Sequence, residues 1–322
     1  MEFKEREFIP VLLGADINTY SVARAFYEAY QVKTYVFGKY MSGPSCYSKI
    51  INYKANPKMD TEEVFMKMIR MMSKKFKNKK IFVLGCGDNY VTLVAKCKPQ
   101  LPENVIAPYI DIDLMNHLVQ KEKFYELCEE HGIDYPETLV YRREMGHDFE
   151  VNFKYPVILK ASDSVDYFAH DFENLHKIFK LNSREEIDKT IDEIYEAGYS
   201  GTLIIQDMIP GNDEYMRVLT SYSGKDGKVK MMCLGHVLLE EHTPLGLGNH
   251  ALIMTEPNEE LMLKAKKLLE ELHFVGFSNF DIKYDSRDGK FKFFELNVRQ
   301  GRSNFYVTNS GFNIAKYLVE DY

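Results

Sequence analysis

The stretch FDIKYDSRDGKFKFFELNVR, residues 280–299, decides the fold of this chain because it has the pattern of a hairpin that carries acidic side chains. Two runs in which apolar residues alternate with polar ones flank a turn signal rich in Ser, Asp and Gly. We predict a three-residue loop, residues 287–289, with Gly289 in the left-handed conformation. That loop would place Asp281 opposite Glu295 on the neighbouring strand.

The acidic side chains of this hairpin predict a metal site. Asp281 and Glu295 would lie roughly 5 Å apart on one sheet face, where they repel each other, and Asn297 follows two residues along on the same face. Oxygen ligands of this kind suit Mg²⁺, which keeps waters and takes its remaining ligands from substrate phosphates. The pattern therefore indicates a nucleoside triphosphate as substrate. Acidic residues also decorate solvated hairpins, and the hairpin pattern alone favours both interpretations equally.

Length and composition describe an ordinary globular protein. The chain has 322 residues, 45% hydrophobic content and a formal net charge of −7. Its Lys and Arg residues are spread along the sequence, so no basic face indicates a nucleic-acid partner. No window approaches roughly 18 apolar residues, and the charged N-terminus is unlike a secretory signal, so we expect a cytoplasmic protein without membrane insertion. Five scattered cysteines without paired spacing predict reduced thiols, and neither a disulfide framework nor a zinc site.

The first third of the chain alternates between predicted strands and helices. Apolar runs predict strands at 8–13, 33–37, 49–53, 81–84 and 105–110, and helical spacing marks 20–30, 61–73 and 90–98. The start Asp60-Thr61-Glu62-Glu63 has the pattern of a capping box. This alternation predicts an α/β fold with an open, mostly parallel sheet covered by helices on both faces over residues 1 to about 110.

The pattern changes after a single predicted helix at residues 111–131, which the Gly and Pro of residues 132–136 stop. The remaining chain predicts strands at 155–160, 177–181, 202–206, 215–222, 229–240 and 251–255, and helices at 183–197 and 259–273. Because the later strands are long and their order is consistent with antiparallel pairing, we expect an α+β fold for this part.

Four cationic side chains stand at the ends of predicted strands. Lys160 ends an apolar strand, and an ammonium aimed into a cleft there would neutralise phosphate, although strand-end lysines are more often solvated. Lys177, at the start of the next strand, is a weaker candidate. Arg299 and Arg302 follow the hairpin, and arginine suits bidentate contact with phosphate or carboxylate. A plain surface pair explains the two arginines equally well.

The predicted strand at 202–206 continues into a loop with exposed backbone. The amides and carbonyls of residues 206–209 could bind an adenine edge, and Asp213 or Glu214 could accept hydrogen bonds from ribose hydroxyls. Taken alone, the stretch is better explained as a polar connection.

Two glycine-containing loops follow predicted strands, at residues 14–16 and 85–88. Neither completes the Gly-x-Gly-x-x-Gly fingerprint, since Tyr90 occupies the position of the third glycine, so we do not expect a dinucleotide site. Both loops lie at the carboxyl ends of parallel strands, where open sheets bind small ligands. The candidate substrate contacts are Asp16, Asn18, Gly85 and Asp88.

Several motifs together resemble the ATP-grasp superfamily. They occur in the order that this superfamily uses: Lys121 before a Gly-Ile-x-x-Pro helix stop, PVILK at 156–160, QDMIPG at 206–211, Asp281, and ELNVR at 295–299. The resemblance covers the whole chain and implies a pre-ATP-grasp domain over residues 1–115, followed by an ATP-grasp domain over residues 116–322. Five further segments are similar to the D-aspartate ligases of Gram-positive bacteria: FIPVLLGAD at 8–16, YSKI at 47–50, GCGD at 85–88, PYID at 108–111 and QKEKFY at 120–125.

The resemblance also implies the cofactors ATP and Mg²⁺ and a role for each matching residue. Those roles are phosphate contacts for Lys121 and Lys160, with Lys177 as a further candidate; an adenine hinge of Gln206, Asp207, Met208 and Ile209; ribose contacts for Asp213 or Glu214; Mg²⁺ ligation by Asp281, Glu295 and Asn297; and contact with the transferred phosphoryl by Arg299.

D-aspartate ligases attach D-aspartate to the lysine side chain of a peptidoglycan precursor, here UDP-muramyl pentapeptide, by way of an acyl phosphate. The resemblance therefore implies a carboxylate-amine ligase with these substrates. A ligase for another amino acid is the first alternative. A non-catalytic ATP-binding module is the second, and the complete set Asp281, Glu295, Asn297 and Arg299 argues against it. Family members usually continue beyond residue 322, so we expect a C-terminal segment to be missing.

Overall fold

The computed structural model describes residues 2–168, 170, 175–243 and 248–322, which form two compact units. The first unit contains residues 1–115, 217–280 and 297–322, and the second contains residues 116–216 and 281–296. The chain therefore passes between the two units several times, and it does so first at the predicted boundary after residue 115. The assignment of residues 116–322 to one ATP-grasp domain stays a prediction.

The first unit contains a five-stranded parallel sheet in the order β3-β2-β1-β4-β5. Its middle strand β1 pairs in parallel with β2 and β4, and Val11, Leu12 and Leu13 are fully buried, as expected of a strand covered on both faces. The strands are β1 (Phe8–Leu13), β2 (Thr34–Gly38), β3 (Ile51–Ala55), β4 (Lys80–Gly85) and β5 (Val105–Ile106). The predicted open parallel sheet is confirmed.

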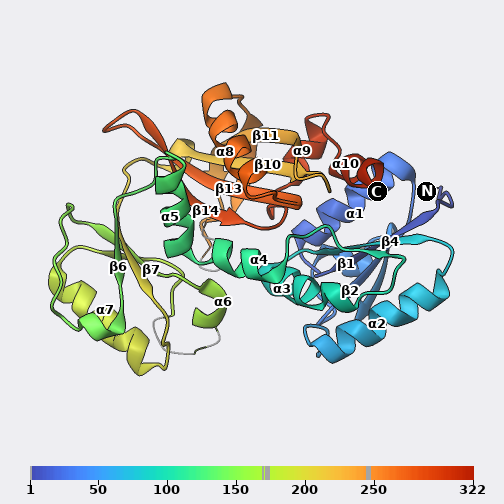
Figure 1. Ribbon diagram of the computed structural model, residues 1–322, viewed down its shortest axis with the longest axis horizontal. Coiled ribbons are helices and arrows are strands. Elements are labelled where there is room, and N and C mark those ends of the chain that lie inside the picture. The colour runs from blue at the N-terminus through green and yellow to red at the C-terminus, as the bar shows by residue number, and fades with distance from the viewer. Residues whose placement is uncertain (1, 169, 171–174, 244–247) are drawn as a thin grey trace. The chain divides into compact units, whose positions relative to one another are not determined.

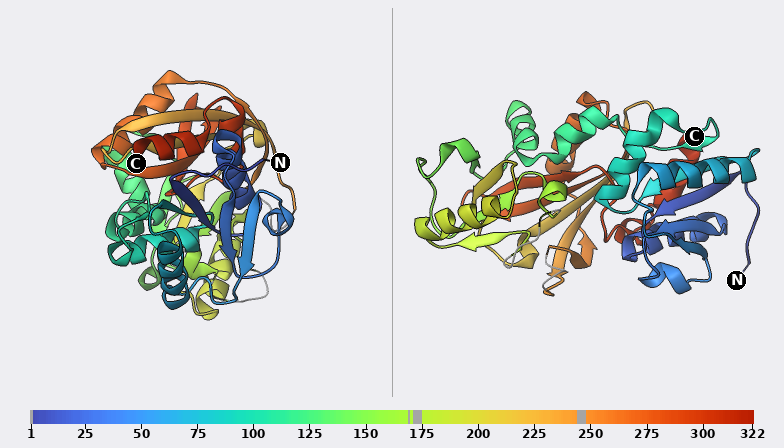
Figure 2. Two further views of the ribbon diagram at one scale, coloured as in Figure 1. Left: turned by 90° about the vertical axis from the view of Figure 1, so that its right-hand side faces the viewer. Right: turned by 90° about the horizontal axis from the view of Figure 1, so that it is seen from below.

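Helices cover both faces of this parallel sheet, with α1 (Ile17–Tyr30) on one face and α2 (Glu62–Lys75) and α3 (Asp88–Cys97) on the other (Figure 1). Figure 2 shows the same blue strands and their helices from two further directions. The capping box predicted for α2 is wrong. Thr61 is the N-cap, but its hydroxyl donates to the carbonyl of Lys58 at 2.8 Å and so makes no side-chain cap.

A second five-stranded sheet has the order β12-β11-β10-β13-β14. Its strands are β10 (Met216–Ser223), β11 (Val229–Glu240), β12 (His250–Thr255), β13 (Gly276–Asp285) and β14 (Lys290–Asn297). β11 pairs antiparallel with both β10 and β12, which confirms the predicted antiparallel strands. The helices that accompany it in sequence are α8 (Glu259–Glu271), α9 (Phe305–Asn309) and α10 (Ile314–Asp321). β13 and β14 each contribute residues to both units.

The second unit contains a four-stranded sheet in the order β6-β9-β7-β8. Its strands are β6 (Thr138–Tyr141), β7 (Val157–Ala161), β8 (Phe179–Leu181) and β9 (Leu203–Asp207). Helix α7 (Arg184–Glu196) buries Ile187, Ile191 and Ile194 in one core with Leu159 and Ile205 of the sheet. Ser183 caps α7 by accepting from the amide of Glu186. The short strand β6 and the short helix α6 (Ser164–Tyr167) were not predicted.

The single helix predicted for residues 111–131 is wrong. The structure has α4 (Ile112–Val119) and α5 (Lys121–Glu130) instead. Gln120 between them is extended, with φ −77° and ψ 118°, and its carbonyl accepts from the amide of Phe124 to begin a new helix.

The predicted three-residue hairpin loop is also wrong, because four residues, 286–289, separate β13 from β14. The turn is built around Asp285, whose carbonyl accepts from the amide of Gly289 at 2.8 Å and whose carboxylate accepts from the amide of Arg287 at 3.0 Å. Gly289 has φ +74°, so its predicted left-handed conformation is confirmed. The predicted cross-strand pairing of Asp281 with Glu295 depended on the shorter loop.

Candidate active site

Lys160 lies at the end of β7 with only 9% of its surface exposed. Its Nζ donates to Oη of Tyr125 at 3.1 Å and lies 5.5 Å from the ring centre of Phe294. Oη of Tyr125 in turn donates to the carbonyl of Phe294 at 2.8 Å. The alternative of a solvated strand-end lysine is therefore wrong for Lys160, whereas Lys177 is exposed.

The charges of two acidic side chains act on the Lys160 ammonium. Burial lowers the pKa of Lys160 to about 8, while the charges of Glu295 and Asp281 raise it and the charge of Lys177 lowers it further. Both carboxylates therefore lie within electrostatic reach of one buried amine.

Lys121 is the first residue of α5 and is only 4% exposed. Its Nζ donates to the carbonyl of Ser162 at 3.3 Å and lies 3.4 Å from Oε1 of Glu295. Burial of an ammonium is costly unless a charge or hydrogen bond offsets it. Lys121 and Lys160 thus share the carboxylate of Glu295 as a counter-charge within the second unit, and Asp281 also acts on Lys160.

The predicted metal ligands offer two carboxylates and one amide. Glu295 and Asn297 are two residues apart in β14, so their side chains emerge from the same face of that strand. The Asn297 side-chain amide donates to the carbonyl of Asn279 at 3.5 Å, and its oxygen accepts from Arg299 at 3.2 Å. Oxygen atoms of these types fit Mg²⁺. The described residues contain no group of three or more His, Cys, Asp or Glu side chains that could hold another metal.

The predicted hinge, residues 206–209, begins with the last two residues of β9, and both of these are buried. Nε2 of Gln206 donates to Oγ1 of Thr138 at 2.7 Å, and the amide of Asp207 donates to the carbonyl of Glu137 at 2.9 Å. Asp213 and Glu214 lie just beyond the hinge, in the short helix Asp213–Tyr215. The Gln206 side chain and the Asp207 amide are therefore tied to the neighbouring strand β6 and the residue before it.

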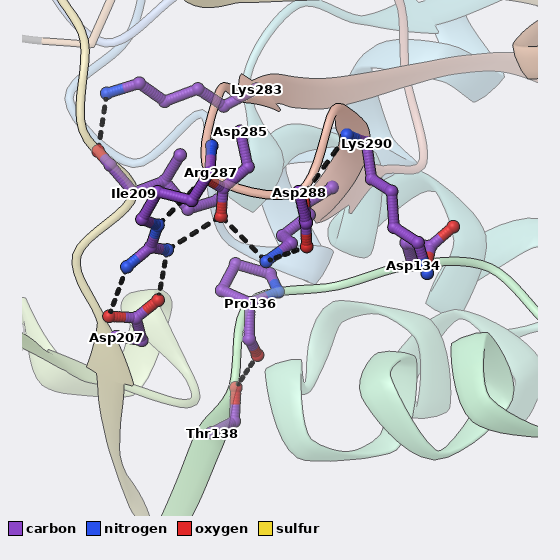
Figure 3. A network of polar contacts seen from close by, with 11 residues as sticks. Asp134, Pro136, Thr138, Asp207, Ile209, Lys283, Asp285, Arg287, Asp288 and Lys290 are labelled. Carbon is purple, nitrogen blue, oxygen red and sulfur yellow. Dashed lines mark hydrogen bonds and ion pairs between the residues drawn. The ribbon is translucent and has the colours of Figure 1, made fainter. Parts of the chain in front are cut away.

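Charged side chains of the β13–β14 hairpin contact this hinge (Figure 3). Arg287 bonds to both carboxylate oxygens of Asp207, and Nζ of Lys283 donates to the carbonyls of Ile209 at 3.1 Å and Gly211 at 2.9 Å. Nothing in the local sequence pattern indicates these contacts.

In the first unit, Asp16 and Asn18 hold the loop after β1. Oδ1 of Asp16 caps α1 by accepting from the amide of Thr19 at 3.2 Å. The side-chain amide of Asn18 donates to the carbonyl of Cys86 at 3.1 Å, and its oxygen accepts from Asn304 at 2.9 Å. Asn18 is 1% exposed, so the structure gives it a bracing position between two loops.

The loop after β4 begins at Gly85, where a Cβ would lie 2.6 Å from the backbone nitrogen of Val91, so only glycine fits. The Gly85 amide donates to Oη of Tyr109 at 2.8 Å, and its carbonyl accepts from Nε2 of Gln300 at 3.3 Å. Sequence reasoning assigned no role to Tyr109, although it lies in the PYID segment, or to Gln300, because local sequence does not show which polar side chain a buried backbone group will meet.

Arg299 and Asp88 form a bidentate ion pair, with Nε to Oδ1 at 2.6 Å and Nη2 to Oδ2 at 2.9 Å. Asp88 is half exposed in this pair, whereas Arg299 is largely buried. Arg302 instead pairs with Glu241 on a different strand end. The structure thus joins Arg299 to one predicted substrate contact and separates Arg302 from that pair.

The five cysteines are free, and four of them are buried. Burial raises the pKa of Cys86 far above its usual range and that of Cys233 to about 11, so neither is poised as a nucleophile. These free thiols agree with the reduced cysteines that the sequence predicts. No helix in the described part of the chain has the length and apolar content needed to cross a membrane.

Comparison with known proteins shows one close relative and many structural neighbours. The chain is 46% identical over 325 residues to a D-aspartate ligase of Enterococcus faecium (strain Aus0004), a match that covers 99% of this chain and 77% of that protein. No protein-family model matches the chain.

Two solved structures illustrate the fold. An L-amino acid ligase from Bacillus licheniformis matches with a TM-score of 0.67 at 14% identity, covering 98% of this chain and 74% of that one. A complex of biotin carboxylase with beta-gamma-ATP from Campylobacter jejuni matches with a TM-score of 0.71 at 15% identity, covering 97% and 70%. At such identities the likeness concerns the fold alone. It confirms the predicted ATP-grasp architecture.

Proposed function

The chain belongs to the D-aspartate ligase family of ATP-grasp enzymes, and we propose that it uses ATP to activate the side-chain carboxylate of D-aspartate and joins it to an amine. The observation that carries this proposal is the pair of buried lysines, Lys121 and Lys160, whose charges interact with Glu295 and, for Lys160, also with Asp281, in a chain with this relative. The proposed amine is the lysine side chain of the peptidoglycan precursor UDP-muramyl pentapeptide. A cytoplasmic location is part of the proposal.

ATP would bind in the second unit. The ammonium groups of Lys121 and Lys160 are buried and oriented by protein carbonyl and hydroxyl groups, so they can hold phosphate oxygens without reorganisation. Exposed Lys177 would add a weaker phosphate contact. The backbone of residues 206–209 would bind the adenine edge, and Asp213 or Glu214 the ribose hydroxyls.

Asp281, Glu295 and Asn297 would hold Mg²⁺, which offsets charge on the γ-phosphoryl when it is bound. The charges around Lys121 and Lys160 support this assignment. Glu295 lies against the buried Lys121, and the charges of Glu295 and Asp281 both act on the buried Lys160, so acidic and basic groups occur together where a divalent cation and phosphates would bind.

The chemistry follows from the poor reactivity of a carboxylate toward amines. Its leaving group would be oxide, so the γ-phosphoryl of ATP is first transferred to it and ADP is released. The amine then attacks the acyl carbon and expels phosphate. Arg299, held in orientation by Asp88, would stabilise the transferred phosphoryl, and no protein nucleophile is required.

An amino acid with two carboxylates and one ammonium needs cationic and anionic partners. Asp16 or Asp88 would receive the ammonium, since a carboxylate that already accepts two hydrogen bonds keeps further lone pairs. Arg302 would receive the carboxylate that is not phosphorylated, in exchange for its bond to Glu241. Asn18 and Gly85 would shape this loop region.

An ADP-release assay with a panel of D- and L-amino acids, with and without the precursor, tests the proposal. We expect release with D-aspartate and at least about tenfold lower efficiency with L-aspartate, because the wrong enantiomer leaves buried polar groups unpaired. Release only with a different acid would replace D-aspartate and keep the ligase. Binding of ATP without release under any condition would favour a non-catalytic module.

A further inference from the structure

Arg287, in the turn between β13 and β14, has no part in the proposed chemistry, yet it bonds to two carboxylates on different strands (Figure 3). Nη1 donates to Oδ1 of Asp207 at 3.1 Å, and Nη2 donates to the other oxygen of Asp207. Nε and Nη2 also donate to the two oxygens of Asp285, at 2.9 and 2.7 Å. One guanidinium thus joins the exit of β9 to the end of β13.

The two carboxylates need this partner because both are buried. The side chain of Asp285 is 0% exposed and that of Asp207 is 9% exposed, while Arg287 is 43% exposed. Lys292 is a second cation, 2.7 Å from Asp285. The hydrogen bonds from Arg287 are the largest cause that keeps the pKa of Asp285 well below its usual range. Lys292 also pairs with Asp288 at 3.0 Å, so Arg287 and Lys292 together hold three carboxylates, of Asp207, Asp285 and Asp288.

The same hairpin holds the hinge at a second point. Lys283 donates to the carbonyls of Ile209 and Gly211. The hinge is therefore bound by Arg287 at its start and by Lys283 at its end. Asp281 and Glu295 lie on this hairpin too. A rigid connection from hairpin to hinge would keep the base-binding backbone at a constant distance from the phosphate-binding side chains.

We propose that Arg287 is a positioning residue that, through Asp207, sets the hinge backbone for binding of the nucleotide base. This inference rests on the proposed use of ATP. Both carboxylate oxygens of Asp207 are engaged by Arg287, so the base would meet the hinge backbone, which this ion pair holds together with Lys283 and the Asp207 amide bond to Glu137. Lysine cannot replace Arg287 fully, since a single ammonium lacks the planar fork that contacts two carboxylates.

The experiment measures binding of ADP in the presence of Mg²⁺ by calorimetry, with tripolyphosphate as a probe that has no base. We expect Arg287→Ala to weaken ADP roughly tenfold, the loss of about one charged hydrogen bond, and Arg287→Lys to weaken it less. Tripolyphosphate should bind both variants as it binds the unmodified protein. Asp207→Asn should resemble Arg287→Ala, and the double variant should be no weaker than the weaker single variant, because both changes break one connection.

Lys290→Ala is the matched control, since it breaks an ion pair from the same turn, 2.6 Å to Asp134, without touching the hinge. It should leave ADP affinity within about twofold. An Arg287→Ala protein that binds ADP as tightly as the unmodified protein would overturn the inference. Equal losses of affinity for ADP and for tripolyphosphate would also overturn it, as would a double variant whose loss of ADP affinity is the product of the two single losses. If Arg287→Ala does not fold, the ADP affinities of Arg287→Lys and Asp207→Asn are measured instead, and unchanged affinity in both would overturn the inference. Failure of the unmodified protein to bind ADP would instead overturn the proposed function.

Discussion

Nζ of Lys121 lies 3.4 Å from Oε1 of Glu295, and this contact joins the start of α5 to β14 within the second unit. The carboxylate of Glu295 also raises the pKa of the buried Lys160. Glu295 thus offsets two buried positive charges. In the protein without ligand, Glu295 should therefore stabilise the fold, whereas the hairpin pattern predicts repulsion between Glu295 and Asp281.

Glu295→Gln should abolish ADP release and also destabilise the protein. The proposed metal site would lose a charged ligand, and Lys121 and Lys160 would lose their shared counter-charge, at a cost of about 1–3 kcal/mol. ADP release and the urea midpoint check the two effects. Glu126→Gln, which breaks an exposed pair with Lys123 on α5, is the control and should change neither. A more stable Glu295→Gln protein would show that repulsion dominates.

Lys160→Met should weaken ATP by about 1.5–3 kcal/mol, the value of a hydrogen bond to a charged group. Without nucleotide the same variant should be more stable at pH 7, because a buried ammonium is replaced by an apolar side chain of similar length. Calorimetry measures the expected loss of ATP affinity, and urea unfolding measures the expected gain in stability. Lys180→Met, at an exposed position of β8, serves as the control. Unchanged ATP affinity would remove Lys160 from the nucleotide site.

The stability of the protein should depend on pH through Lys160. Its pKa is about 8 in the folded state against 10.5 for an ordinary lysine, so the unfolded chain binds more protons between these values. The cost of burying the charge is fully present below pH 8 and is relieved as the pH rises toward 10.5. Urea unfolding at several pH values between about 7 and 9.5 should show a rise in stability that Lys160→Met lacks. Parallel curves for the two proteins would contradict this.

Asp88→Asn should reduce kcat/KM at least about tenfold while leaving folding stability nearly unchanged. Asp88 is half exposed, so its ion pair adds little to stability. Loss of its charge would release the Arg299 guanidinium from its bidentate orientation and remove a candidate ammonium partner. Steady-state kinetics with ATP and the amino acid varied in turn, together with urea unfolding, provide the test. Full activity would remove Asp88 from the site.

Thiol labelling of the native protein at pH 8 should modify Cys46 and spare the other cysteines until the chain unfolds. Cys46 is partly exposed, whereas Cys86, Cys97, Cys128 and Cys233 are buried. Burial also raises the pKa of all four buried thiols. Counting the reactive thiols with and without denaturant measures this, and rapid modification of a second thiol would indicate local opening.

The sequence by itself determined the elements of regular structure, because local patterns suffice for them. The alternating apolar runs and amphipathic helices predicted the parallel sheet, and the turn residues predicted the left-handed Gly289. The order of the motifs predicted the ATP-grasp fold and the candidate lysines and carboxylates. Sequence patterns failed first at boundaries, such as the break at Gln120, where one extended residue ends a helix inside an otherwise helical pattern.

Only the tertiary structure decided which charged side chains are buried and what they face. Lys121 has no signal of its own in the sequence, yet it is buried against Glu295, 174 positions later in the numbering (295 less 121). Arg287 belongs to a polar turn, yet it holds Asp207, 80 positions away. Such pairs depend on which strands lie side by side. A charge in the sequence has the same local pattern whether water or a buried partner of opposite sign surrounds it.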